Sequence, residues 1–120
     1  MAKRIPIVAA ILLTATAHAQ TFTKITGQPL TDTPESFRSA VFVDVNNDGY
    51  PDAFTTTGDN NTNNMLFLNN QDGTFTRTTT GPIVNEHSNS DGATFGDFNN
   101  DGYLDCAVVN WYNQFNLLYQ

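Results

Sequence analysis

The chain contains one thirteen-residue stretch twice, as AVFVDVNNDGYPD from Ala40 to Asp52 and as ATFGDFNNDGYLD from Ala93 to Asp105. The two copies start 53 residues apart, and nine of their thirteen positions are identical. Self-similarity at a fixed offset of this length is typical of repeat proteins, in which each repeat packs on its neighbours. The repeat, rather than any single residue, therefore decides the expected fold.

The similarity extends outward from this stretch in both directions. NNMLFL (63–68) matches FNLLYQ (115–120) after a one-residue deletion, and four upstream residues return at the same offset. We therefore delimit a first repeat at 20–74 and a second at 75–120, incomplete at its C-terminus. Because the second copy stops within the repeat, we expect a fragment of a longer protein rather than a ring of several copies. The upstream pairs are Phe22 and Phe75, Thr23 and Thr76, Thr26 and Thr79, and Pro29 and Pro82.

Each repeat consists of short runs of β-prone residues separated by turn residues. Runs such as AVFV and CAVV are apolar on both faces of a strand, which indicates sheets covered on both sides. No window outside the leader shows helical periodicity. The expected fold is all-β, with about two β-propeller blades of four antiparallel strands each. Strands are expected at 40–45, 53–57, 65–68, 74–78, 93–98, 106–110 and 115–119.

The N-terminus has the three-part layout of a secretory signal peptide. Lys3 and Arg4 precede the apolar run 5–13, and small residues ending in Ala17-His18-Ala19 follow it. The apolar run is only about half as long as a membrane-spanning helix requires. We therefore predict a signal peptide at 1–19, cleavage after Ala19, and a secreted or cell-surface protein.

The remainder of the chain is acidic. The whole sequence has five basic and twelve acidic residues; since Lys3 and Arg4 lie in the leader, three basic and twelve acidic residues remain, a net charge of −9. Such a chain has no basic stripe to offset phosphate charge. We therefore expect neither nucleic-acid binding nor attraction to an anionic membrane surface, and no membrane insertion.

The repeated stretch includes a nine-residue loop with oxygen-bearing side chains at positions one, three, five and nine. Alternate spacing lets a tight loop direct these side chains to one centre, a glycine at position six permits a sharp reversal, and position seven offers its backbone carbonyl. Calcium prefers such oxygen ligands, whereas zinc, copper and iron favour nitrogen and sulfur ligands that the loops lack. The candidate ligands are Asp44, Asn46, Asp48, Tyr50 and Asp52 in the first loop, and Asp97, Asn99, Asp101, Tyr103 and Asp105 in the second.

The loops allow two other interpretations. The spacing matches the first half of an EF-hand loop, but position twelve is Thr55 or Val108 instead of glutamate, and the flanks are strands. An EF-hand fold is therefore not expected. Asp, Asn and Gly also dominate turns that bind no metal, which is the remaining alternative. The recurrence at one offset favours about two Ca²⁺ ions, one in each loop.

These residues resemble the FG-GAP/VCBS repeat family, which is known from the propellers of integrin α-subunits and from secreted bacterial proteins. ATFGDFNNDGYLD is similar to the family's central motif, and the LLY and NNQDGTFT segments to its later strands. The resemblance covers about 22–120 and implies a calcium ion in a β-hairpin loop of each blade, held by the ligands named above. The first copy departs from the motif at Val43, where the second has Gly96, and at Pro51, where the second has Leu104.

The sequence favours a binding function over catalysis. His18 lies in the leader and His87 in a polar loop, so no His, Ser and Asp combination suggests an active site, although a longer parent chain could carry one. Cys106 has no second cysteine to pair with and is expected to be buried in a strand.

We expect a calcium-stabilised propeller segment for extracellular adhesion or ligand binding, whose partners are an extracellular protein or glycan and further blades of the same chain or of other copies. The alternative is part of a carbohydrate-binding or polysaccharide-degrading propeller enzyme, because sugar rings could stack on Trp111 and Tyr112.

Overall fold

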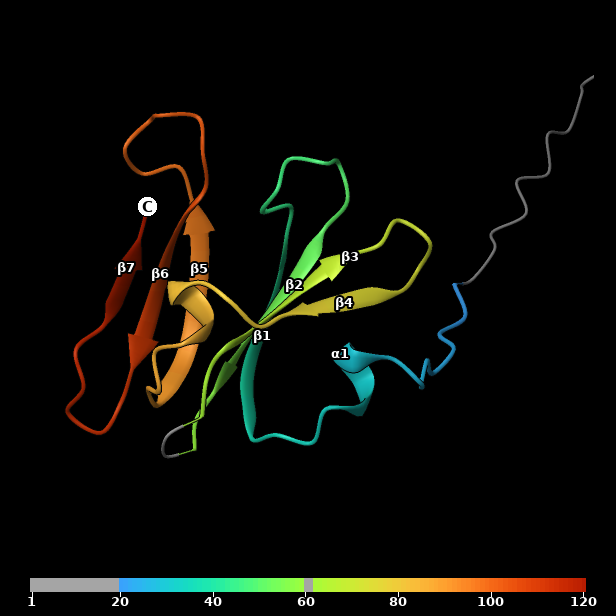
Figure 1. The fold of residues 1–120 in the computed structure, drawn as a ribbon, viewed down its shortest axis with the longest axis horizontal. Helices are drawn as coiled ribbons and strands as arrows, with labels where there is room; N and C mark the ends of the chain where they lie inside the picture. Colours follow the sequence, from blue (N-terminus) through green and yellow to red (C-terminus); the bar gives the residue numbers. More distant parts are fainter. Residues whose placement is uncertain (1–19, 60–61) are drawn as a thin grey trace, which may run out of the picture.

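Residues 20–59 and 62–120 are described by a computed structural model (Figure 1). The predicted signal peptide lies outside the described residues. Strands β1 (Phe37–Val43), β2 (Asp52–Thr57), β3 (Met65–Asn69) and β4 (Phe75–Thr78) form one antiparallel sheet, sheet 1, in that order. Strands β5 (Ser90–Gly96), β6 (Asp105–Asn110) and β7 (Leu117–Tyr119) form a second, sheet 2. The fold is all-β, as predicted, and is consistent with a partial β-propeller.

Two short helical segments were not predicted. The helix α1 (Pro29–Asp32) precedes β1, and the 3₁₀ helix η1 (Pro82–Val84) precedes β5. Pro29 and Pro82, which are equivalent in the repeat, each lie at the start of their segment, where the fixed φ of proline favours a helical turn. Segments of four and three residues are too short to produce a helical period in the sequence.

Strand β2 of sheet 1 is covered on both faces. Every residue of β2 is buried, because its side chains alternate between two separate apolar clusters. On one face, Ala53 packs with Met65 and Phe67, and Leu30 of α1 covers them. On the other face, Phe54 packs against sheet 2. The sequence-based prediction of cover on both sides concerned the runs AVFV in β1 and CAVV in β6, and it is wrong for both, because no sheet of the described residues lies over Phe42 (63% exposed) or Val109 (54% exposed). Among the strands of the described residues, β2 is the one whose two faces are both covered.

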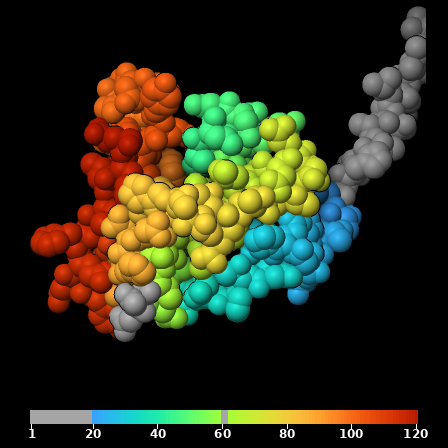
Figure 2. All heavy atoms as spheres, in the orientation of Figure 1, coloured from blue at the N-terminus to red at the C-terminus, as the bar shows by residue number. Residues whose placement is uncertain are grey.

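The two sheets meet through an apolar interface. Phe54 and Phe95 contact edge to face, with ring centroids 5.5 Å apart and an interplanar angle of 81°, and Cys106 and Val108 complete the buried cluster. Ile83 of η1 also packs against it. In Figure 2 the segment around η1, in gold, lies between the red strands of sheet 2 and the yellow-green strands of sheet 1.

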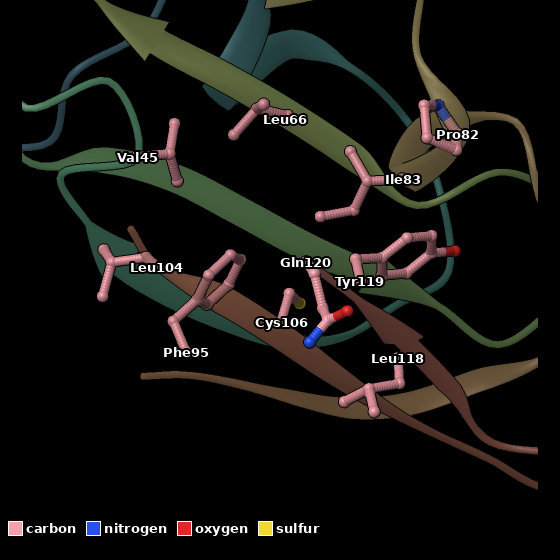
Figure 3. Close-up of a pocket in the computed structure, with 10 residues that line it drawn as sticks. All are labelled: Val45, Leu66, Pro82, Ile83, Phe95, Leu104, Cys106, Leu118, Tyr119 and Gln120. Carbon is pink, nitrogen blue, oxygen red and sulfur yellow. The ribbon is translucent and has the colours of Figure 1, made fainter. Parts of the chain in front are cut away.

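A cavity of about 430 Å³ lies between the sheets (Figure 3). Cys106 is in its wall and is buried, as predicted, and burial raises the pKa of its thiol to about 11. The side chain of Leu118 points away from the other lining residues, toward the opposite side of sheet 2. The lining residues are Val45, Leu66, Pro82, Ile83, Phe95, Leu104, Cys106, Leu118, Tyr119 and Gln120.

The structural units are offset from the units delimited in the sequence. Strand β4 completes sheet 1 by pairing with β3, although it follows position 74. Each structural unit instead begins at its short helix, α1 or η1. Sheet 1 with α1 therefore spans 29–78, and sheet 2 with η1 begins at Pro82.

Candidate metal centre

The two predicted loops occupy equivalent places in the two sheets. Residues 44–51 connect β1 to β2, and residues 97–104 connect β5 to β6. Both loops project from the same end of the sheets, at the top of Figure 1. The hairpin geometry therefore brings the two acidic stretches to one end of the molecule.

A network of hydrogen bonds organises the first loop. The main-chain N–H of Asp48 donates to Oδ1 of Asp44 (3.1 Å) and to Oδ1 of Asn46 (3.0 Å). The N–H of Gly49 donates to Oδ2 of Asp44 (2.8 Å), and that of Tyr50 to Oδ1 of Asp48 (2.9 Å). The side chains at positions one, three and five are thus drawn together around the loop's own N–H groups.

The second loop repeats this network bond for bond. The N–H of Asp101 donates to Oδ1 of Asp97 (3.0 Å) and of Asn99 (2.9 Å). The N–H of Gly102 donates to Oδ2 of Asp97, and that of Tyr103 to Oδ1 of Asp101, both at 2.9 Å. The same residues at the same spacing therefore give the same local structure in both sheets.

The backbone reversal explains why these positions are Asn and Gly. Asn47 and Asn100 have φ values of 57° and 60°, and Gly49 and Gly102 have φ values of 88° and 90°. Glycine adopts these left-handed conformations freely, and asparagine adopts them more readily than most other residues.

The last aspartate of each loop begins the following strand and is buried there. Oδ2 of Asp52 accepts the N–H of Val45 (3.1 Å), and Oδ2 of Asp105 accepts that of Phe98 (2.9 Å). These bonds close each loop across its base. The structure therefore places Asp52 and Asp105 at the buried base of their loops, where their carboxylates accept main-chain N–H groups.

The first loop has further contacts with the turn between β3 and β4. Oδ1 of Asp52 accepts the N–H of Asn69 (2.8 Å), whose side-chain amide donates to the carbonyl of Pro51 (3.0 Å). Nε2 of Gln71 donates to Oδ2 of Asp48 (3.3 Å). No local pattern predicts these contacts, since they join residues 17 to 23 positions apart.

The hydrogen bonds have an electrostatic consequence at Asp48. The pKa of Asp48 is lowered from its usual value, chiefly by the N–H of Tyr50; desolvation raises it by a smaller amount, and the side chains of Asn46 and Gln71 lower it further. Asp48 is thus held in its ionised form. Each loop with its closing aspartate contains three carboxylates, so both loops concentrate negative charge.

The chemistry of the donor set suits a hard cation, but the carboxylates are not assembled around one point. Each carboxylate oxygen can accept more than one partner, so Asp44 and Asp97 retain lone pairs beyond those used by the N–H groups. Within residues 20–59 and 62–120, however, no three His, Cys, Asp or Glu side chains are grouped so that they could hold a metal ion. The loops therefore contain oxygen atoms of the kind that calcium prefers. In this structure, however, their carboxylates accept main-chain N–H groups and do not point to one common centre.

The opposite end of the sheets carries an aromatic pair. Trp111 and Tyr112 follow β6, and their ring centroids are 4.1 Å apart at 37°. The guanidinium of Arg38, in β1, lies 4.5 Å from the Trp111 ring centroid. Tyr112 is 67% exposed. Sequence analysis identified the aromatic pair but not Arg38, which lies in the other repeat.

Two tandem antiparallel sheets with equivalent hairpin loops define this chain as a β-propeller-like repeat segment. The family model described as FG-GAP-like repeat matches residues 44–108, which include both loops and more than half of the chain. The chain therefore belongs to the FG-GAP-like repeat family. No curated protein and no solved structure matches it. In the described part of the chain, no helix is long and apolar enough to cross a membrane.

Proposed function

We propose that the chain is a secreted, calcium-stabilised propeller segment that serves extracellular adhesion or ligand binding. The observation that carries this proposal is the identical hydrogen-bond network of the two loops, built from the same oxygen-bearing residues 53 positions apart. Asparagine supports such turns without carrying a charge. A bound cation would therefore explain why each loop has three carboxylates.

Calcium's role in this proposal is structural. It would offset the charge of three carboxylates at each loop and hold the hairpin that joins the first two strands of each sheet. Because the carboxylates accept main-chain N–H groups in this structure, calcium binding requires them to turn toward a common centre. The ligands would be the side chains of Asp44, Asn46, Asp48 and Asp52 with the carbonyl of Tyr50, and those of Asp97, Asn99, Asp101 and Asp105 with the carbonyl of Tyr103.

Export and an extracellular partner belong to the same proposal. The signal-peptide pattern at 1–19 supports secretion, and calcium sites of weak affinity are suited to extracellular calcium concentrations. We propose binding rather than catalysis for the described residues. A carboxyl group such as that of Asp48, which is kept ionised by its hydrogen bonds, is unsuited to act as a general acid.

Thermal unfolding in chelator and in millimolar calcium tests the structural role. The midpoint of the wild-type chain is expected to rise with calcium, because a ligand that binds the folded state stabilises it by mass action. The double variant Asp44→Asn with Asp97→Asn should lose this rise. Asp91→Asn, the same kind of substitution at an exposed position outside the loops, should retain it. A wild-type melting curve that is the same in both conditions would refute the proposal.

A glycan-binding function is the second candidate, and one observation favours it. Arg38 and Tyr112 both contact Trp111, so Tyr112 is the ring of this group that is left largely exposed for stacking on a sugar. A glycan array probed with and without calcium tests this function. Tyr112→Ala should abolish any signal that Phe115→Ala, a change at another exposed aromatic residue, preserves. The absence of any glycan signal from the folded protein would leave protein adhesion as the proposal.

A further inference from the structure

The aromatic pair after β6 lies in a turn that a tyrosine rarely adopts. The N–H of Gln114 donates to the carbonyl of Trp111 (3.3 Å), and the two residues between them, Tyr112 and Asn113, have φ values of 56° and 57°. Positive φ at both central positions favours glycine, asparagine or aspartate, because a bulky side chain is strained there. Tyr112 therefore presents an exposed ring from a strained backbone, a combination typical of binding sites.

The exposure of Tyr112 is a property of its position in the repeat. Its equivalent, 53 residues earlier, is Asp59. Asp59 is also exposed, although sheet 2 packs beside sheet 1. A neighbouring sheet thus leaves this position of the repeat open to solvent, and the accessible ring of Tyr112 is a feature of the turn itself.

Hydrogen bonds fix the segment that carries the aromatic pair. The side-chain amide of Asn110 donates to the carbonyl of Phe115 (2.8 Å), and its side-chain oxygen accepts the hydroxyl of Ser90 (2.9 Å). Ser90 is fully buried and also accepts the side-chain amide of Asn64, which precedes β3 in sheet 1 (2.9 Å). The segment is thus bonded to both sheets before any ligand binds, which reduces the entropy lost on binding.

A guanidinium group lies beside the aromatic pair, and its donors have no partners in the described residues. The side chain of Arg38 crosses Gly58 so closely that any Cβ there would clash with it. Its guanidinium lies 4.5 Å from the ring centroid of Trp111, the equivalent of Gly58 in the second repeat. Within residues 20–59 and 62–120, no group accepts a hydrogen bond from this guanidinium and no carboxylate pairs with it. Arg38 is therefore a positioned cation with free donors.

The site lies apart from the negative charge of the metal loops. The lysine and arginine residues of 20–120 are Lys24, Arg38 and Arg77, and the six carboxylates of the loops lie at the opposite end of the sheets (Figure 1). A planar guanidinium binds a carboxylate through two parallel hydrogen bonds. An exposed aromatic ring next to it provides a flat apolar surface on which a sugar ring can stack.

We propose that Arg38 and Tyr112 form a binding site for an acidic sugar. The guanidinium binds the carboxylate of the sugar, and the tyrosine ring stacks on the sugar ring. Trp111 contacts both groups and holds them beside each other. This inference rests on the glycan-binding function, the second candidate above, and adds the chemical class of the glycan.

A glycan array that pairs uronic acid oligosaccharides with their methyl esters tests the proposal, since the two members of a pair differ in charge at the carboxyl groups. The wild-type chain is expected to bind at least one acid about tenfold more tightly than its ester, because the ester loses the charged hydrogen bonds to Arg38. Titration of the bound pairs measures this ratio. Equal binding of acid and ester would refute this proposal alone, whereas no binding to any glycan would refute the glycan-binding function as well.

Two variants separate the contributions of the charge and the ring. Arg38→Gln should lower the affinity for the acid about tenfold and leave the affinity for the ester unchanged. Tyr112→Asn suits the turn, so the chain should stay folded, but it should weaken acid and ester alike because the stacking surface is lost. Arg77→Gln, which removes an exposed arginine of β4, is the control and should change neither affinity.

Circular dichroism shows whether the variants are folded. If Arg38→Gln is not, Arg38→Lys replaces it, because lysine keeps the charge but not the paired donors and should also reduce the preference for the acid. A preference for the acid that persists in the folded Arg38 variant would overturn the proposal. Binding of poly-glutamate as tightly as the acidic sugar would overturn it too, since the site would then recognise an acidic peptide.

Discussion

The two repeats have matching loops but differ in their surroundings. The bonds from the N–H groups at positions five, six and seven recur in both loops with lengths that agree within about 0.1 Å. Burial does not recur: Leu66 of sheet 1 is partly buried against sheet 2, whereas its equivalent in sheet 2, Leu118, is 62% exposed. The comparison shows that local hydrogen bonding follows from local sequence, whereas burial depends on which sheet lies next to the strand.

The aspartates that close the loops should show the largest difference between the repeats. Asp52 accepts two main-chain N–H groups, from Val45 and Asn69, whereas Asp105 accepts that of Phe98. Removing a buried charged acceptor leaves its donors without partners, so Asp52→Ala should cost about 3 kcal/mol of unfolding free energy. Asp105→Ala should cost about half as much by the same reasoning. Chemical denaturation in chelator measures both, and equal losses would show that the bond to Asn69 contributes nothing.

Two leucines at equivalent positions of the repeat form a matched pair. Leu66 packs at the interface between the sheets, and its equivalent Leu118 is exposed. Leu66→Ala should lower the unfolding free energy by about 2 kcal/mol, the low end for a buried leucine, because its burial is partial. Leu118→Ala should change it by less than about 0.5 kcal/mol. Chemical denaturation of both variants measures the difference; a large loss in Leu118→Ala would contradict the described exposure.

The glycines of the loops should respond alike. Gly49 and Gly102 have φ values of 88° and 90°, and no atom within 4 Å would meet an added Cβ. Backbone strain alone should therefore cost about 1 kcal/mol in Gly49→Ala and in Gly102→Ala. Unequal losses in chelator would mean that the two loops differ in backbone conformation.

Acid titration should show the smallest effect. Because the pKa of Asp48 is lowered in the folded chain, its contribution to stability is present above about pH 3.8 and is lost as the pH falls through the lower, folded value. In chelator, the unfolding free energy of Asp48→Asn should therefore fall less steeply below pH 4 than that of the wild type. Parallel curves would show that these hydrogen bonds do not favour the ionised carboxylate.

Much of the strand framework and both loops could be predicted, because each is encoded by neighbouring residues. Asn47 and Gly49 specify the reversal, and the apolar runs specify β1 and β2. The ends of the strands were predicted less accurately: the strand expected at 40–45 is β1, which begins at Phe37 and ends at Val43. It begins earlier because Phe37 pairs with Thr57 of β2, and it ends earlier because the N–H of Val45 bonds to the side chain of Asp52 within the loop.

The contacts that sequence analysis missed join distant residues. Arg38 meets Trp111 only because β1 and the residues after β6 are brought together by the packing of the two sheets. The bonds of Asn69 and Gln71 to the first loop depend in the same way on the pairing of β3 with its neighbours. A local pattern of residue types does not encode such contacts.

Isothermal titration with calcium tests the central claim, that both loops are metal sites, most directly. The account predicts two ions bound per wild-type chain, one in Asp44→Asn, one in Asp97→Asn and none in the double variant, with two retained in the control Asp91→Asn. No binding heat from the folded wild-type chain, or binding that the double variant retains, would contradict it.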